Sequence, residues 1–83
     1  MNQQEIKTIV SDILVDMLLI SETEIKPDST FKDLGADSLD EVEIILEVER
    51  KFHISISEEM IPQVLSVESL SNYIEKKIKE QST

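Results

Sequence analysis

Eighty-three residues suffice for one small domain, which we place over residues 1–83, and leave no room for a second hydrophobic core. Eight Lys and Arg against 18 Asp and Glu give a net charge of −10, which argues against nucleic acid and anionic membranes as partners and favours a monomer. The absence of cysteine excludes a disulfide, a thiolate nucleophile and a cysteine-bound zinc, and it fits a cytoplasmic location.

The first 20 residues predict an amphipathic helix over roughly residues 3 to 19. Its apolar residues recur at steps of three and four, as expected for one helix face: Ile6, Ile9, Val10, Ile13, Met17 and Ile20. The longest purely apolar run, residues 17–20, is far too short for membrane insertion. One Gly, two Pro and no sustained alternation of apolar and polar residues favour an all-α fold.

Residues 21–37 predict a long connection, because turn-forming residues are spread through them. They include Pro27, the run Asp28-Ser29-Thr30 and Gly35, which we expect to have a positive φ before the next helix. A connection of this length without any ordering would be unusual in a compact domain. Three apolar side chains are therefore expected to hold it against the core: Ile25, Phe31 and Leu34.

Residues 38–52 predict a second helix, which starts at Ser38 and ends near His53. Ser38 and Glu41 match the S-x-x-E capping box, in which Ser38 would be the N-cap. At about 100° per residue, the apolar residues fall on two strips at nearly opposite sides of this helix. The strip expected in the core consists of Ile44, Ile45, Val48 and Phe52. The second strip consists of Leu39, Val42 and Leu46.

The second apolar strip and the acidic residues near it permit two interpretations. We expect the acids together on a third strip: Asp40, Glu41, Glu43 and Glu47. The apolar side chains either pack beneath the loop and the other helices, or remain exposed as a patch flanked by carboxylates. The acids are either an ordinary solvated face or part of the same surface. An exposed patch would indicate a docking site for a partner.

The last third of the chain predicts a short helix at 58–61 and a longer helix from Ser66, as N-cap, to about Lys79. Pro62 lies where the short helix would continue, so we expect that helix either to stop at Ile61 or to shift in register. The long helix is expected to bury Val67, Leu70, Ile74 and Ile78. Together these elements predict a small four-helix bundle, with three main helices, one short third helix and a long loop between helices one and two.

The segment around Ser38 resembles the signature of acyl carrier proteins. The resemblance rests on Asp33-Leu34-Gly35-Ala36-Asp37-Ser38-Leu39-Asp40, continued by Glu41-Val42-Glu43-Ile44, and on the order of the helices. It implies a covalent 4′-phosphopantetheine on Ser38, whose thiol would hold acyl groups as thioesters. It also implies a phosphopantetheinyl transferase and acyl-transfer, condensing and reducing enzymes as partners. The implied pathway is fatty acid biosynthesis, with dedicated polyketide and aminoacyl carriers as alternatives.

The resemblance further implies that the helix beginning at Ser38 is the docking surface. The expected docking residues are Asp37, Leu39, Asp40, Glu41, Val42, Glu43, Leu46 and Glu47, with Met60 at the border. The resemblance also implies that an acyl chain could lie between the helices, with Val42, Leu46, Ile61 and Val64 as candidates for the lining. For Ile61 and Val64 we favour the alternative that they are ordinary core residues.

No enzyme active site is expected in this chain. Ser38 and the sole histidine, His53, lie about 22 Å apart along one helix, so they cannot form a catalytic pair. We also expect no metal site, because the region from Asp28 to Asp40 lacks the pattern of a calcium-binding loop; weak binding of a divalent ion to the acidic strip is the alternative. Arg50 and Lys51 depart from the acidic pattern of fatty-acid carriers. An unmodified acidic helical adaptor, docking through the same surface, is the alternative from a different functional class.

Overall fold

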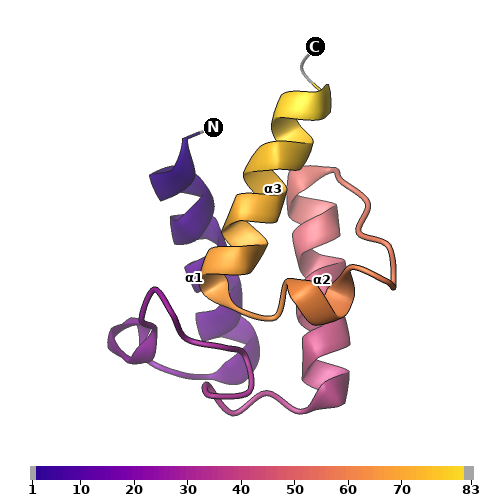
Figure 1. Ribbon diagram of the computed structural model, residues 1–83. Coiled ribbons are helices and arrows are strands. Elements are labelled where there is room, and N and C mark those ends of the chain that lie inside the picture. Colours follow the sequence, from indigo (N-terminus) through magenta and orange to yellow (C-terminus); the bar gives the residue numbers. More distant parts are fainter. Residues whose placement is uncertain (1, 82–83) are drawn as a thin grey trace.

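The computed structural model describes residues 2–81 and shows three α-helices joined by loops that contain two short 3-10 turns (Figure 1). The elements are α1 (Gln3–Leu18), η1 (Glu22–Glu24), α2 (Ser38–Phe52), η2 (Ile61–Gln63) and α3 (Val67–Gln81). Residues 2–81 contain no β-strand, and the only β-type pairing among them is an isolated antiparallel β-bridge between Thr30 and Ser66. The expected all-α fold is confirmed, but two successive short turns, the second of which is η2, stand where the short third helix was expected.

Helix α1 packs against both α3 and α2, and the three helices enclose one core (Figure 1). Their buried apolar residues are Ile6, Val10, Ile13 and Leu14 of α1, Ile44, Ile45, Val48 and Phe52 of α2, and Val67, Leu70 and Ile74 of α3. The predicted core face of α2 is confirmed. On α1, Ile9 and Met17 are only partly buried, whereas Leu14 is fully buried although it lies off the predicted stripe. Because α1 meets a neighbour on two sides, its buried face is broader than one stripe.

The connection between α1 and α2 is held against the core by the three predicted side chains. Phe31 is fully buried, and Ile25 and Leu34 are partly buried against the core. Two backbone hydrogen bonds also tie this connection to the segment before α3. They run from Phe31 N to Leu65 O at 2.9 Å and from Val67 N to Ser29 O at 3.1 Å. The loop that leads to Ser38 is thereby fixed to the start of α3.

The expected short helix at 58–61 is wrong in position and type, because Pro62 interrupts the backbone hydrogen bonding. Met60 N donates to Ser57 O at 3.0 Å, and Ile61 N donates to Glu58 O at 3.3 Å. Pro62 has no N–H with which to continue this series. The pattern resumes when Gln63 N donates to Met60 O at 2.9 Å, and only this second turn forms η2. Two successive single turns therefore replace the expected helix.

Candidate functional site

The N-terminus of α2 is capped by Asp37, one residue before the expected cap. Asp37 Oδ1 accepts a hydrogen bond from Asp40 N at 2.9 Å, and Asp40 Oδ2 accepts one from Asp37 N at 3.1 Å. The expected box of Ser38 and Glu41 is wrong, because Asp is as good a cap as Ser and the extended backbone of Asp37 ends the loop. Ser38 is instead the first residue of α2, exposed and outside the capping box.

A tight turn before α2 anchors the segment that leads to Ser38. Leu34 N and Ala36 N both donate to Phe31 O, at 3.1 and 3.0 Å. Gly35 lies within this turn with a φ of 95°, as predicted. A residue with a side chain would adopt this conformation only at a cost of about 1–2 kcal/mol. Phe31 and Ala36 are both buried, so the turn fixes the start of α2 to the core.

Leu39, Val42 and Leu46 form an exposed apolar ridge along the solvent side of α2. Their exposed fractions are 66, 46 and 53 %, whereas the opposite face of the helix is buried. The interpretation that these side chains pack beneath the loop is therefore wrong. A run of exposed apolar side chains rimmed by charge is typical of a surface that binds a partner.

The predicted acids on α2 have different surroundings. Asp40 is engaged in the cap, and Glu47 Oε2 accepts a hydrogen bond from Arg50 Nη1 at 3.1 Å. Glu43 is exposed. Glu49, in the same helix, holds the following loop, because its Oε2 accepts a hydrogen bond from Ile56 N at 2.8 Å. Glu43 is thus the acid of α2 best placed to meet a partner.

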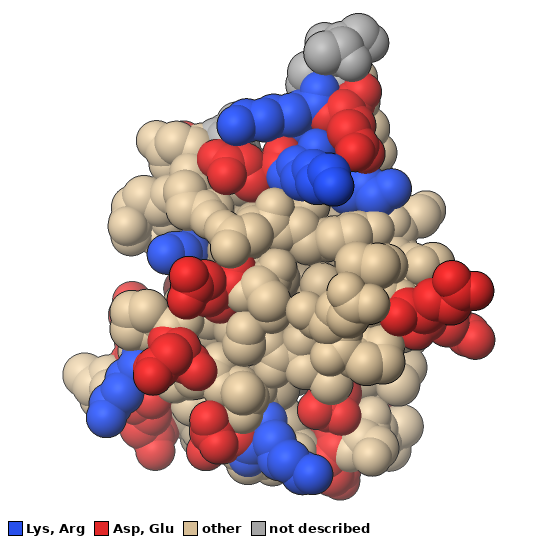
Figure 2. Space-filling view, in the orientation of Figure 1, with Lys and Arg blue, Asp and Glu red and all other residues tan. Residues whose placement is uncertain are grey.

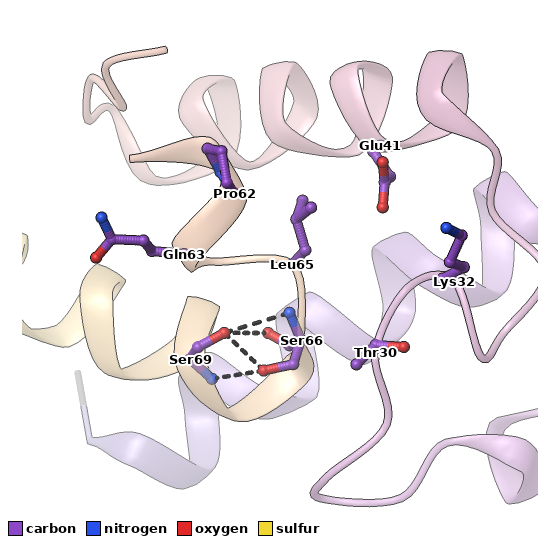
Figure 3. A pocket seen from close by; sticks show the side chains of 8 residues that line it. All are labelled: Thr30, Lys32, Glu41, Pro62, Gln63, Leu65, Ser66 and Ser69. Carbon is purple, nitrogen blue, oxygen red and sulfur yellow. Dashed lines mark hydrogen bonds between the residues drawn. The ribbon is translucent and has the colours of Figure 1, made fainter. Parts of the chain in front are cut away.

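Glu41 does not lie on the acidic strip, which corrects the expectation. Residues two apart in a helix are rotated by about 200°, so Glu41 and Glu43 point in nearly opposite directions. Glu41 instead lines a surface hollow of about 490 Å³ between α2, η2 and the start of α3 (Figure 3). The other lining residues are Thr30, Lys32, Pro62, Gln63, Leu65, Ser66 and Ser69. These residues come from three separate segments, so no local sequence pattern marks them.

The candidate cavity residues and Met60, expected at the border of the docking surface, are found in three different environments. Val42 and Leu46 are about half exposed, so they do not line an enclosed cavity in this conformation. Val64 is in the core, as expected, and Ile61 is partly buried against it. Met60 is partly buried and lines a smaller hollow with Tyr73, Lys76, Lys77 and Glu80 of α3. A role for Met60 in docking stays a prediction.

Comparisons with known proteins identify the family to which these features belong. The family model for the phosphopantetheine attachment site matches residues 5–74. The acyl carrier protein of Chlorobium phaeovibrioides is 44 % identical over 78 residues, which cover 93 % of this chain and 100 % of that protein. The chain belongs to the acyl carrier protein family. The acyl carrier protein of Chloroherpeton thalassium is 45 % identical over 80 residues, covering 95 % of this chain and 100 % of that protein.

A solved structure shows the same relationship in three dimensions. The HMG-ACPI domain from the CurA module of Lyngbya majuscula has a TM-score of 0.87 to this chain and 29 % sequence identity. The match covers 99 % of this chain and 83 % of that one. The arrangement of α1, α2 and α3 is therefore that of an acyl carrier protein.

Membership in the acyl carrier proteins confirms the resemblance drawn from the sequence. The chain is an acyl carrier with a covalently attached 4′-phosphopantetheine, and it is not itself an enzyme. Its partners include phosphopantetheinyl transferase and the enzymes of an acyl-chain pathway. The alternative of an unmodified adaptor is thereby excluded. Among the helices of residues 2–81, none is long and apolar enough to cross a membrane, and no group of three or more His, Cys, Asp or Glu in that range could hold a metal ion.

Proposed function

We propose that Ser38 Oγ is the attachment point of the 4′-phosphopantetheine. The observation that carries this proposal is the exposure of Ser38 as the first residue of α2, outside the capping box. The amides of Ser38 and Leu39 have no acceptor within the helix, because no helical turn precedes them. These amides and the positive end of the helix dipole favour a phosphodiester at this position.

The surroundings of Ser38 fit an anionic group in spite of two neighbouring carboxylates. Asp37 and Asp40 repel a phosphate, but each already has one oxygen engaged by a backbone N–H of the capping box. Asp37 and Ser38 are also exposed, so water and salt screen the repulsion. The tight turn at Gly35 keeps the hydroxyl on a backbone anchored to the core.

The prosthetic group supplies the thiol that this cysteine-free chain lacks, and acyl groups are held on it as thioesters. Fatty acyl groups in fatty acid biosynthesis are the proposed cargo. The support is the run Gly35-Ala36-Asp37-Ser38-Leu39-Asp40 and the match to proteins named acyl carrier protein along their whole length. Mass analysis of the thioesters isolated from cells tests this: saturated or 3-hydroxylated alkyl chains are expected, whereas polyketide or aminoacyl thioesters would contradict it.

The proposed docking surface follows the apolar ridge of α2. It consists of Asp37, Leu39, Asp40, Val42, Glu43, Leu46 and Glu47, with Glu41 and Met60 at its borders. Weak contacts of exposed charges set the encounter rate and orientation more than the affinity, which suits a carrier that visits several enzymes in turn. The net charge of −10 supports the further proposal that the chain acts as a monomer, and its 83 residues around a single core support the proposal of one domain. The lack of cysteine supports a cytoplasmic location.

The attachment proposal is tested by intact-mass measurement after co-expression with a phosphopantetheinyl transferase. The wild-type chain is expected to gain the mass of one phosphopantetheine, and Ser38→Ala is expected to gain none. Ser55→Ala is the matched control, because Ser55 is also an exposed serine but lies in the loop after α2. A Ser38→Ala variant that is still modified, or a wild-type chain that is not, would contradict the proposal.

A further inference from the structure

The exposed side of α2 changes the sign of its charge along the helix. Glu43 is exposed in the second turn, whereas Arg50 and Lys51 are exposed in the last turn. Glu43 and Arg50 are seven residues apart, which is about two turns, so they lie on the same side of α2 about 10 Å apart. Leu46 lies between them, three residues from one and four from the other. The apolar ridge is therefore flanked by a negative charge near Ser38 and a positive charge at its far end.

An ion pair neutralises Glu47, one of the two carboxylates near the far end of this surface. Arg50 Nη1 lies 3.1 Å from Glu47 Oε2, and the two side chains are 76 and 32 % exposed. Glu49 is engaged with the backbone of Ile56. Lys51 then adds an exposed positive charge to a neutral pair. Because an ion pair this exposed contributes little to stability, Arg50 can exchange Glu47 for a carboxylate of a partner at little cost.

We infer that the acyl-chain enzymes that accept this carrier have a docking surface with two charged ends. Basic side chains lie beside the entrance of the active site, where Ser38 must be presented, and a carboxylate lies about 18 Å further on, opposite Arg50. The inference rests on the proposed attachment at Ser38. It also explains orientation, because a helix docked in the reverse direction would place Arg50 against the basic side chains. Arg50 and Lys51 therefore select both the partner and the direction of docking.

The test compares acyl transfer from the loaded carrier to a condensing enzyme encoded in the same genome. Arg50→Glu is expected to lower kcat/KM about threefold to tenfold, because it turns an exposed attraction into a repulsion. The loss is expected in KM, with kcat unchanged, since the residue makes no contact at the reacting atoms. Lys79→Glu is the matched control, because it changes the net charge equally but lies in the last turn of α3. Figure 2 shows basic side chains gathered near this end of α3, away from the start of α2. Circular dichroism should show both variants folded.

The outcomes separate this inference from the proposed function. Unchanged or faster transfer by Arg50→Glu would overturn the inference alone, because an enzyme surface that is basic throughout would favour the added carboxylate. An equal loss with Lys79→Glu would overturn it as well, since net charge and not position would then decide. In support, changing the facing carboxylate of the enzyme to Lys should restore transfer from Arg50→Glu. A wild-type chain that cannot be loaded with phosphopantetheine would overturn the proposed function, and this inference with it.

Discussion

Asp37→Ala tests which side chain caps α2. The substitution removes the oxygen that accepts from Asp40 N and leaves that amide without its side-chain acceptor, whereas the reciprocal bond to Asp40 Oδ2 comes from the backbone N–H of residue 37 and is kept. Loss of an N-cap of this type costs about 1 kcal/mol, within a range of about 0.5–2 kcal/mol. For a domain of this size, 1 kcal/mol lowers Tm by about 4–8 °C. Asp37→Asn keeps an acceptor at the same position, so its Tm should differ from wild type by much less.

The assay is thermal unfolding of the unmodified chain, followed by circular dichroism. Ser38→Ala is the decisive comparison, because Ser38 is the first residue of α2 and takes no part in the cap. We expect it to change the free energy of unfolding by less than about 0.5 kcal/mol. If Ser38→Ala lost as much stability as Asp37→Ala, the serine would be capping the helix, and the account of a hydroxyl left available for modification would be refuted.

Three further predictions concern stability. Leu19 has a φ of 55° and is 89 % exposed, so Leu19→Gly should raise the free energy of unfolding by about 0.5–1 kcal/mol. Urea denaturation checks this, and an equal gain with Leu19→Ala would contradict it. Ser71 Oγ is buried without a hydrogen-bond partner, so Ser71→Ala should raise the free energy of unfolding by about 1 kcal/mol. Ser69→Ala should lower the free energy of unfolding instead, because Ser69 Oγ accepts a hydrogen bond from Ser66 N at 3.2 Å. A loss with Ser71→Ala in the same assay would contradict the first part. Finally, a tenfold increase in NaCl from low ionic strength should raise Tm, since the net charge of −10 is then screened, and an unchanged Tm would show that self-repulsion is negligible.

The helices could be predicted from the sequence because apolar periodicity reports directly on burial. The core strip of α2 is buried as predicted, and Phe31 holds the loop. The exact start of α2 could not be predicted from the pattern alone, because two capping boxes lie in adjacent registers. Asp37 and Asp40 fit as well as Ser38 and Glu41, and an aspartate is as good a cap as a serine. The three-residue turn η1 is too short to leave a periodic pattern.

The exposed part of the site was only partly accessible to sequence analysis. The apolar ridge could be recognised, because its three residues form a strip opposite the core strip of the same helix. Whether the other elements cover that strip depends on how they pack, and the structure shows that they do not. The hollow beside Glu41 depends on contacts between the loop, η2 and α3. Pro62 predicts an interruption of the short third helix. The two turns around it depend on backbone hydrogen bonds that no residue pattern specifies.

The central claim is that one exposed hydroxyl at the start of α2 carries the arm on which cargo is held. It is tested most directly by proteolysis of the loaded chain and tandem mass spectrometry of the peptide that contains Ser38. The account predicts that fragment ions place the phosphopantetheine on Ser38 Oγ. Fragments that place it on any other residue would contradict the account.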